Sequence, residues 1–269
     1  MASTALTTLP LNPAYNSARV ILSDCVVTSP PSTVLLSQDK LSQITNPHIQ
    51  RSMVVQILRF VSPHPWGSSA AEVSRNSTSL GRIVDSLFHH PLDETSAKRS
   101  TFSAGSHVLW TPVYIGPDGQ LKYKKLNSGV DGWTDGWLAS RSPPYRSVNG
   151  PSGFDIDVTP LILDKKSSTG LVEVLFDNRF ILSFNPHAIP DEVVERLLSS
   201  PESHRLVVTA AKKYLLPRLV FRSSTGNDIE EIGTSDASQK VRSVSAVPGD
   251  RRHLFGTGWA SWRLARVFE

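Results

Sequence analysis

Apolar residues at helical spacing dominate the stretch from residue 47 to residue 88. They recur four, four and three positions apart at Ile49, Met53, Ile57 and Phe60. This spacing predicts an amphipathic helix over 48–61, with Pro47 in its first turn and Pro63 and Pro65 beyond its end. A second helix is predicted over 70–88, because Ser69 and Glu72 have the spacing of a capping box. Its inward positions are Val73, Leu80, Val84 and Leu87.

The pattern changes from helical to strand periodicity after residue 100. Residues 108–115 and 120–126 flank a Gly-Pro-Asp-Gly turn and predict a hairpin. Residues 171–176 and 180–184 predict a second hairpin around Asp177-Asn178-Arg179. A short helix is expected over 190–198, and further strands over 137–141, 154–159, 205–209 and 218–221. The predicted class is α+β, a helical hairpin followed by a mostly antiparallel β-rich region with a late short helix.

This pattern divides the chain into four segments. Residues 1–44 are rich in Ser, Thr and Pro and are expected to form a partly disordered N-terminal arm, in which Val34 to Leu36 form either a short strand or the lead into a helix. Residues 45–92 form the helical hairpin and 101–222 the β-rich domain. Residues 223–269 are expected to be a flexible segment followed by a C-terminal amphipathic segment.

Composition narrows the class of protein without giving an activity. The chain has 269 residues, 39% of them apolar, and a single cysteine, which excludes an internal disulfide framework. Its longest apolar runs, such as 53–58, are far shorter than a membrane span, so no membrane partner is predicted. A basic start followed by a long apolar core is absent, so secretion is not expected, and the acid-poor start leaves mitochondria and cytoplasm both open.

The familiar catalytic motifs are missing from the sequence. There is no Gly-x-Ser-x-Gly elbow, no His-Glu-x-x-His and no phosphate loop of the Gly-x-x-x-x-Gly-Lys type. Asp155 and Asp157 share a face of a predicted strand, but solvated carboxylates are the simpler interpretation. The neighbours His89 and His90 have no carboxylate at a metal-ligand spacing. We therefore predict no catalytic residue and no metal ligand in this chain.

Basic residues offer the one pattern that indicates a ligand. The net charge of +4 is small, but groups of Lys and Arg lie on the predicted helices and strands, with Trp and Tyr near some of them. Such groups bind the phosphates and bases of RNA, although a solvated surface has the same composition. The candidate tRNA-binding residues are Arg51, Arg59, Arg75, Arg82, Lys122, Lys124, Lys125, Arg141, Arg146, Lys212 and Lys213.

Four stretches, taken in order, carry a resemblance to a known family. They are 48–51 leading to 57–67 (HIQR and ILRFVSPHPWG), 104–105 with 108–113 (AG and VLWTPV), 136–144 (GWLASRSPP) and 174–180 (VLFDNRF). Their order and spacing resemble the C-terminal half of fungal tRNA(Ile)-lysidine synthetase-like proteins, over roughly residues 30–221. That family belongs to the N-type ATP pyrophosphatases. It uses ATP to adenylate a cytidine of the tRNA(Ile) anticodon, and lysine then displaces AMP.

The resemblance implies tRNA binding more strongly than it implies catalysis. The family's Ser-Gly-Gly-x-Asp-Ser pyrophosphate loop is absent, so ATP and magnesium are implied for the complete family enzyme and none is expected to bind this chain. On this hypothesis the chain supplies tRNA binding, either as a truncated product or beside a separate catalytic ATP pyrophosphatase chain. The alternative is a non-enzymatic protein-interaction module derived from that fold; an unrelated hydrolase or transferase is the least favoured. Trp66 and Trp110 are expected in the core.

Overall fold

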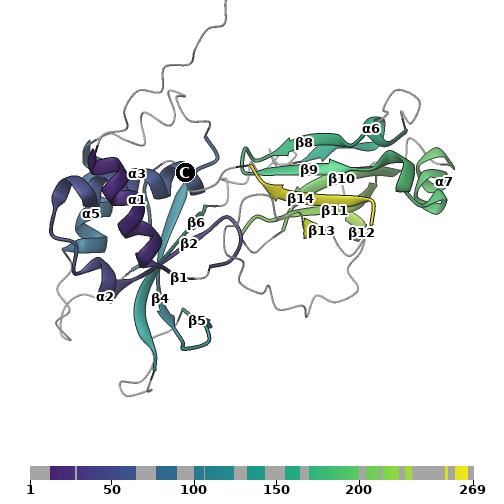
Figure 1. Ribbon diagram of the computed structural model, residues 1–269. Coiled ribbons are helices and arrows are strands. Elements are labelled where there is room, and N and C mark those ends of the chain that lie inside the picture. Colours follow the sequence, from purple (N-terminus) through teal and green to yellow (C-terminus); the bar gives the residue numbers. More distant parts are fainter. Residues whose placement is uncertain are drawn as a thin grey trace, which may run out of the picture.

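The structure is a computed structural model. It describes residues 13–27, 29–64, 77–89, 100–105, 107–123, 132–142, 155–163, 170–199, 204–211, 214–223, 228–231, 252–253 and 258–265. The described elements form two lobes, each with helices and antiparallel sheet (Figure 1). The α+β class predicted from the sequence is confirmed.

The first lobe is built on a six-stranded antiparallel sheet, sheet A. Its strand order is β1-β2-β6-β4-β3, with β5 pairing beside β4. The strands are β1 (Val26–Val27), β2 (Val34–Ser37), β3 (Phe102–Ser103), β4 (Val108–Ile115), β5 (Leu121–Lys122) and β6 (Thr134–Arg141). The predicted hairpin of β4 and β5 is confirmed over the described residues, and Gly119 supplies the left-handed backbone of its turn (φ 71°).

Helices cover one face of sheet A. They are α1 (Pro13–Cys25), α2 (Gln38–Leu41), α3 (Pro47–Val61) and α5 (Ser77–Phe88). Alternate strand residues face them, including Leu36, Trp110 and Trp137, while Leu35 and Leu138 point to the opposite face. The indole N–H groups of both tryptophans are satisfied, Trp137 by Gln38 and Trp110 by the Ala104 carbonyl.

The predicted helices agree with the described residues. Helix α3 begins after Asn46, whose side chain accepts from the backbone N–H groups of His48 and Ile49. The inward positions of α5, Leu80, Val84 and Leu87, are buried as expected. The predicted start of this helix, with Ser69, Glu72 and Val73, and also Trp66, lie outside the described residues.

The second lobe packs two four-stranded antiparallel sheets around one core. Sheet B has the order β12-β11-β10-β7, and sheet C has the order β13-β14-β9-β8. Their strands are β7 (Ile156–Asp157), β8 (Val172–Phe176), β9 (Phe180–Phe184), β10 (His204–Ala210), β11 (Pro217–Ser223), β12 (Asp228–Glu231), β13 (Arg252–His253) and β14 (Ala260–Leu264). Both sheets contribute to the core, for example through Phe221 from sheet B and Phe180 from sheet C.

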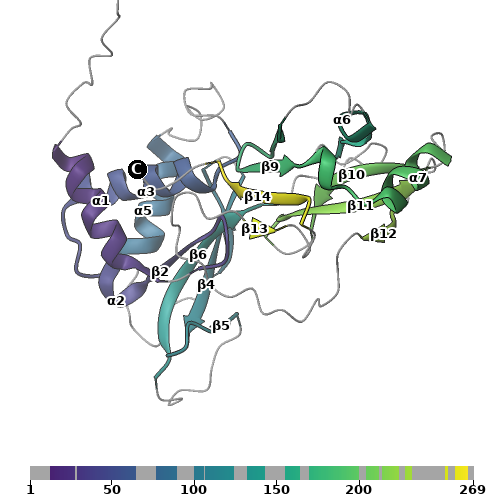
Figure 2. The ribbon, with the colours of Figure 1, turned by 45° about the vertical axis from the view of Figure 1, so that its right-hand side comes forward.

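Two short helices complete the second lobe. They are α6 (Thr159–Leu163) and α7 (Asp191–Ser199), with a single 3-10 turn at Pro186–Ala188 before α7. Figures 1 and 2 place α6 and α7 at the end of the lobe that lies away from the first lobe. Helix α7 is the late short helix expected from the sequence, and Leu197 is its buried contact with the core.

The grouping of elements differs from the four predicted segments. The expected N-terminal arm contains α1 and the fully buried strand β2, which lies between β1 and β6. The expected flexible C-terminal segment contributes strands β12, β13 and β14. Both differences have the same cause: a short strand inside a sheet is stabilised by neighbours far away in the chain, and local sequence does not report those neighbours. Among the described residues, no helix is long and apolar enough to span a membrane.

Candidate nucleic-acid interface

The predicted tRNA-binding residues fall in three places. Arg51 and Arg59 lie on α3 and Arg82 on α5, Lys122 lies on β5, and Arg141 ends β6. The other candidates lie outside the described residues; they are Arg75, Lys124, Lys125, Arg146, Lys212 and Lys213.

Helix α3 carries basic residues and no acidic one. Arg51 and His48 are exposed near its beginning, and Arg59 is half-buried near its end. On α5, the guanidinium carbon of Arg82 lies 5.1 Å from the centre of the Phe102 ring. This cation–π contact holds Arg82 against the edge of sheet A. The helices therefore present positive charge, but in separate positions.

Lys122 and its neighbours form a cation–aromatic group at the end of β5. The Lys122 Nζ lies 4.3 Å from the centre of the Trp133 ring, and the Tyr123 side chain is 50% exposed. Gly116 allows Trp133 to approach, because a Cβ at Gly116 would meet the indole at 3.0 Å. A lysine and an accessible ring side by side are the groups that bind a phosphate and stack on a base.

The hydroxyl groups of Tyr123 and Tyr214 lie 2.8 Å apart and form a hydrogen bond between the two lobes. Tyr214 lies between β10 and β11, and it packs against the face of sheet A that the helices leave open. Burial raises the pKa of Tyr214, and its hydrogen bond with Tyr123 raises it further. Both phenols are thus held in place. We call Lys122, Tyr123, Trp133 and Tyr214 the tyrosine-pair surface.

This contact joins two tyrosines that each stand beside lysines in the sequence. Tyr123 lies in Lys122-Tyr123-Lys124-Lys125, and Tyr214 follows Lys212 and Lys213 directly. The tyrosines are 91 residues apart in the chain, yet their side chains touch. The lysines beside both tyrosines are evident in the sequence, whereas the contact between the tyrosines has no local sequence signal.

The helical cations do not belong to the tyrosine-pair surface. In sheet A, Lys122 is the strand partner of Tyr114 on β4. Phe102, whose ring contacts Arg82, is the strand partner of Trp110 on the same strand. Four residues of strand separate these positions, a length of roughly 13 Å. Figure 1 shows β5 at the end of sheet A that lies away from α3.

Arg141 occupies a different environment from the other predicted cations. Its side chain is 6% exposed, and its Nε lies 3.4 Å from an Asp177 carboxylate oxygen of the second lobe. Burial lowers the pKa of Arg141, and the Asp177 charge opposes that effect. The surface position expected for this arginine is therefore not observed, because its guanidinium is committed to a buried carboxylate.

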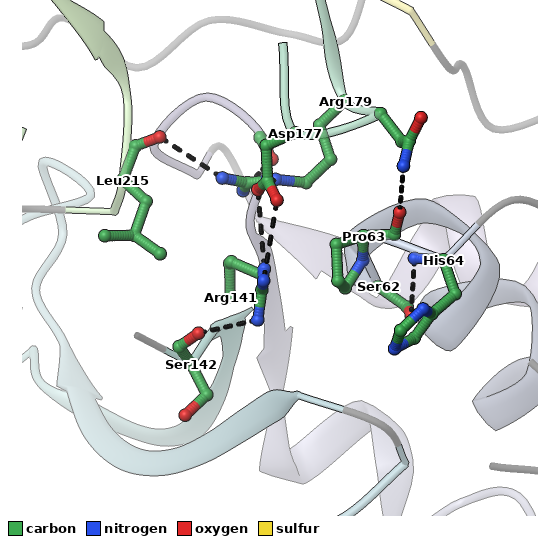
Figure 3. A network of polar contacts seen from close by, with 10 residues as sticks. Ser62, Pro63, His64, Arg141, Ser142, Asp177, Arg179 and Leu215 are labelled. Carbon is green, nitrogen blue, oxygen red and sulfur yellow. Dashed lines mark hydrogen bonds and ion pairs between the residues drawn. The ribbon is translucent and has the colours of Figure 1, made fainter. Parts of the chain in front are cut away.

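Asp177 is the centre of a polar network between the lobes (Figure 3). Arg179 binds the same carboxylate at 2.6 Å, and both side chains are almost fully buried. The Asn178 side chain donates to the Pro63 carbonyl at 2.8 Å, just beyond the end of α3. Buried charges require partners and hydrogen bonds of this kind. We call the Arg141–Asp177–Arg179 network and its hydrogen-bonded neighbours the lobe junction.

Several residues with left-handed backbone lie at or next to the lobe junction. Among the described residues, the non-glycine positions with positive φ are Ser32, His107, Asp177, Asn178, Tyr214 and Leu215. Ser32 accepts from Arg179, the Leu215 carbonyl accepts from Arg179, and the His107 carbonyl accepts from Ser142. Left-handed backbone is costly for most non-glycine residues, less so for Asp and Asn, and it persists where surrounding contacts impose it.

Three of the four stretches that carry the family resemblance contribute to the lobe junction. Pro63 belongs to the first stretch, Arg141 to the third and Asp177 to the fourth, while Gly105 of the second lies against Leu58 within the first lobe. Gly105 has a φ of 79°, and a Cβ there would overlap the Leu58 side chain at 2.3 Å. These motifs thus contain residues that join the two lobes. Their part in the resemblance therefore reflects a structural role and not a catalytic one.

Two histidines border the lobe junction. The ring centres of His64 and His107 lie 5.4 Å apart. Burial lowers the pKa of His107, the Arg141 charge lowers it further, and Asp177 acts in the opposite direction. The folded environment therefore disfavours the protonated form of His107.

The remaining carboxylates and the thiol that could take part in chemistry have structural roles in the described residues. Asp155 binds Thr209 and Arg222, and Asp157 accepts from the backbone N–H of Thr159. Cys25 is buried in the core, and burial raises the pKa of its thiol. Within the described residues, no three His, Cys, Asp or Glu side chains gather as metal ligands.

Comparisons with known proteins add no relative. No family model matches the chain, and no curated protein or solved structure matches it.

Proposed function

We propose that this chain binds tRNA through the tyrosine-pair surface. It would serve a modification reaction of the tRNA(Ile)-lysidine synthetase type, in which a separate catalytic ATP pyrophosphatase chain supplies the ATP chemistry. The observation that carries the proposal is the Tyr123–Tyr214 hydrogen bond, since it joins across the lobes two tyrosines that each stand beside lysines in the sequence. The family resemblance supplies the kind of RNA.

The chemistry of the tyrosine-pair surface fits a flexible or looped RNA segment. Lysine ammonium groups neutralise phosphates, and the exposed ring of Tyr123 offers a platform for an unpaired base. Arg51 and Arg82 on the helices provide further positive charge at a distance. An extended ligand such as tRNA can reach both places, whereas a small anion cannot.

A binding measurement on the purified chain tests this proposal. Fluorescence anisotropy with labelled tRNA should show affinity that falls with added salt, because bound lysines release counterions from phosphates. ATP, measured in parallel, should not bind. The Lys122→Glu variant should weaken tRNA binding, while Lys40→Glu on α2 serves as the matched control, since Lys40 contacts the Asp24 carbonyl. Salt-independent binding, or equal effects of the two variants, would contradict the proposal.

A second function, a non-enzymatic protein-interaction module, is favoured by one feature of sheet C. On its edge strand β8, Leu175 is 52% exposed, and Leu171 just before the strand is 47% exposed; Glu173 between them is paired with Arg263. An extended partner segment with two apolar residues at alternate positions would complement this pattern. Binding of such a peptide that is lost in Leu175→Asp, without any tRNA binding, would favour this second function.

A further inference from the structure

We propose that Arg179 is a positioning residue that sets the geometry of the tyrosine-pair surface without reaching it. This inference rests on the proposed function for its RNA readout. Arg179 is 1% exposed, so it cannot contact a bound RNA directly.

Arg179 connects three parts of the molecule through one side chain. Its Nε donates to Asp177 at 2.6 Å in its own hairpin, and its Nη1 donates to Ser32 Oγ at 2.6 Å in the first lobe. Its Nη2 donates to the carbonyl of Leu215 at 3.2 Å. Leu215 is the residue after Tyr214, so the third bond acts on the turn that carries one half of the tyrosine pair.

The turn at Tyr214 and Leu215 requires such a bond. Both residues have left-handed backbone, with φ of 58° and 51°. This conformation disfavours residues with a bulky side chain, and neither Tyr nor Leu has the short polar group that makes Asn and Asp tolerant of it. The Arg179 hydrogen bond fixes the orientation of the Leu215 carbonyl, which a relaxed turn would not keep.

The Ser32 bond gives the turn its position relative to the first lobe. Ser32 lies two residues before β2, the strand next to β6 in sheet A. Tyr123 follows β5 of the same sheet. A single planar guanidinium therefore fixes the Tyr214 turn to the sheet that carries Tyr123, Lys122 and Trp133. A lysine at position 179 keeps a charge for Asp177 but lacks the fork that makes three directed bonds.

The test compares Arg179→Lys with Arg222→Lys. Arg222 is a matched control because it binds Asp155 in the same lobe, with 16% of its side chain exposed, and it lies near the other end of β11. For Arg179→Lys we expect tRNA affinity about tenfold lower and a smaller salt dependence, because one half of the surface has moved. For Arg222→Lys we expect affinity close to that of the natural chain.

A spectroscopic measurement separates this inference from the proposed function. Tyrosine ionisation, followed by phenolate absorbance against pH, should show one tyrosine that ionises late in the natural chain, because burial and Tyr123 raise the pKa of Tyr214. In Arg179→Lys this late ionisation should move toward the ordinary range, and in Arg222→Lys it should stay. This readout needs no RNA, so it stands even where tRNA fails to bind.

Each outcome decides one point. An Arg179→Lys chain that matches Arg222→Lys in both affinity and tyrosine ionisation overturns the positioning role. Absence of tRNA binding by the natural chain overturns the proposed function alone. If circular dichroism shows that Arg179→Lys is unfolded, Ser32→Ala takes its place, since it removes a single bond of Arg179 and should shift both readouts in the same direction. An unchanged Ser32→Ala chain would then count against the positioning role.

Discussion

Two turns of the second lobe each contain two consecutive residues with left-handed backbone. One turn is made of residues that tolerate this conformation and the other of residues that disfavour it. Asp177 and Asn178 form the first, between β8 and β9, with φ of 48° and 53°. Tyr214 and Leu215 form the second, between β10 and β11. Asp and Asn adopt this conformation with little cost, whereas Tyr and Leu do not.

The difference shows where each turn obtains its shape. The first turn is encoded locally and in addition supplies Asp177 and Asn178 to the lobe junction. The second turn depends on contacts from outside: Arg179 binds the Leu215 carbonyl, Tyr123 binds the Tyr214 hydroxyl, and Leu215 is buried in the core. Backbone strain of this kind persists only where surrounding contacts impose it, so the second turn is the one whose shape the rest of the molecule determines.

The largest effect is expected from removing the charge of the first turn. Asp177→Asn keeps a residue tolerant of left-handed backbone but leaves Arg141 and Arg179 without their buried carboxylate. We expect the free energy of unfolding to fall by about 3 kcal/mol in urea denaturation. Asp157→Asn is the control, because Asp157 is 38% exposed and lies 3.9 Å from Arg205; its cost should stay below about 1 kcal/mol. Equal losses in the two variants would show that the junction is not a buried ion network.

A smaller effect is expected at the second residue of the same turn. Asn178→Ala loses the hydrogen bond to the Pro63 carbonyl and places a less tolerant residue at positive φ. Its cost should be about 2 kcal/mol, while Asn178→Gly, which suits the backbone and loses only the bond, should cost about 1 kcal/mol. Both values come from denaturant midpoints. If glycine were no better than alanine, local conformation would not be what Asn178 contributes.

The turn at Tyr214 offers a test at alkaline pH. The raised pKa of Tyr214 means that the folded state favours the neutral phenol. Its contribution to stability is complete below the ordinary tyrosine pKa of about 10 and is lost as the pH rises beyond it. Tyr214→Phe keeps the packing and removes this loss, so the gap in thermal midpoint between variant and natural chain should close above about pH 10. A gap that stays constant with pH would be inconsistent with a buried phenol.

The smallest effect is expected at His107. Burial and Arg141 lower the pKa of this histidine, so the folded state resists its protonation. Stability should therefore fall as the pH drops below the unfolded value near 6.5 and continue to fall through the lower folded value. His107→Asn suits the left-handed backbone and cannot titrate, so its denaturant midpoint should depend less on pH over that range. His187→Asn, on the 3-10 turn of the second lobe, is the control.

Sequence periodicity was sufficient for the amphipathic elements and the hairpins. Helix α3 and strands β4, β8 and β9 were predicted because each has a clear stripe or alternation beside a turn signal. Strand β2 was ambiguous, since all four of its residues are buried and a continuous apolar run has no alternation. Strand β14 was not assigned for a related reason: its partner β9 lies about eighty residues earlier in the chain.

The candidate site was predictable only in part. Lys122 was identified from its charge, but nothing local indicated that Tyr123 would meet Tyr214, because their separation in the chain is long. Arg141 was expected at the surface, as most arginines are, and its buried partner Asp177 lies 36 residues further along. The motif 174–180 carries the family resemblance, whereas its role in joining the lobes follows from the tertiary contacts of Asp177, Asn178 and Arg179, which the local sequence does not indicate.

The position of β14 in sheet C has a consequence for the order of folding during synthesis. Residues 260–264 form an interior strand between β9 and β13, and the backbone N–H of Ala265 donates to the Arg179 carbonyl at 2.8 Å. Every described element of the first lobe precedes residue 143, so that lobe can fold while the ribosome is still translating the second. Sheet C is complete only after β14 has left the ribosome. Until then β9 is paired with β8 on one edge and has no strand partner on the other. A chain whose synthesis pauses near residue 250 would thus carry a sheet C with one strand edge still unpaired, and unpaired strand edges are prone to aggregate.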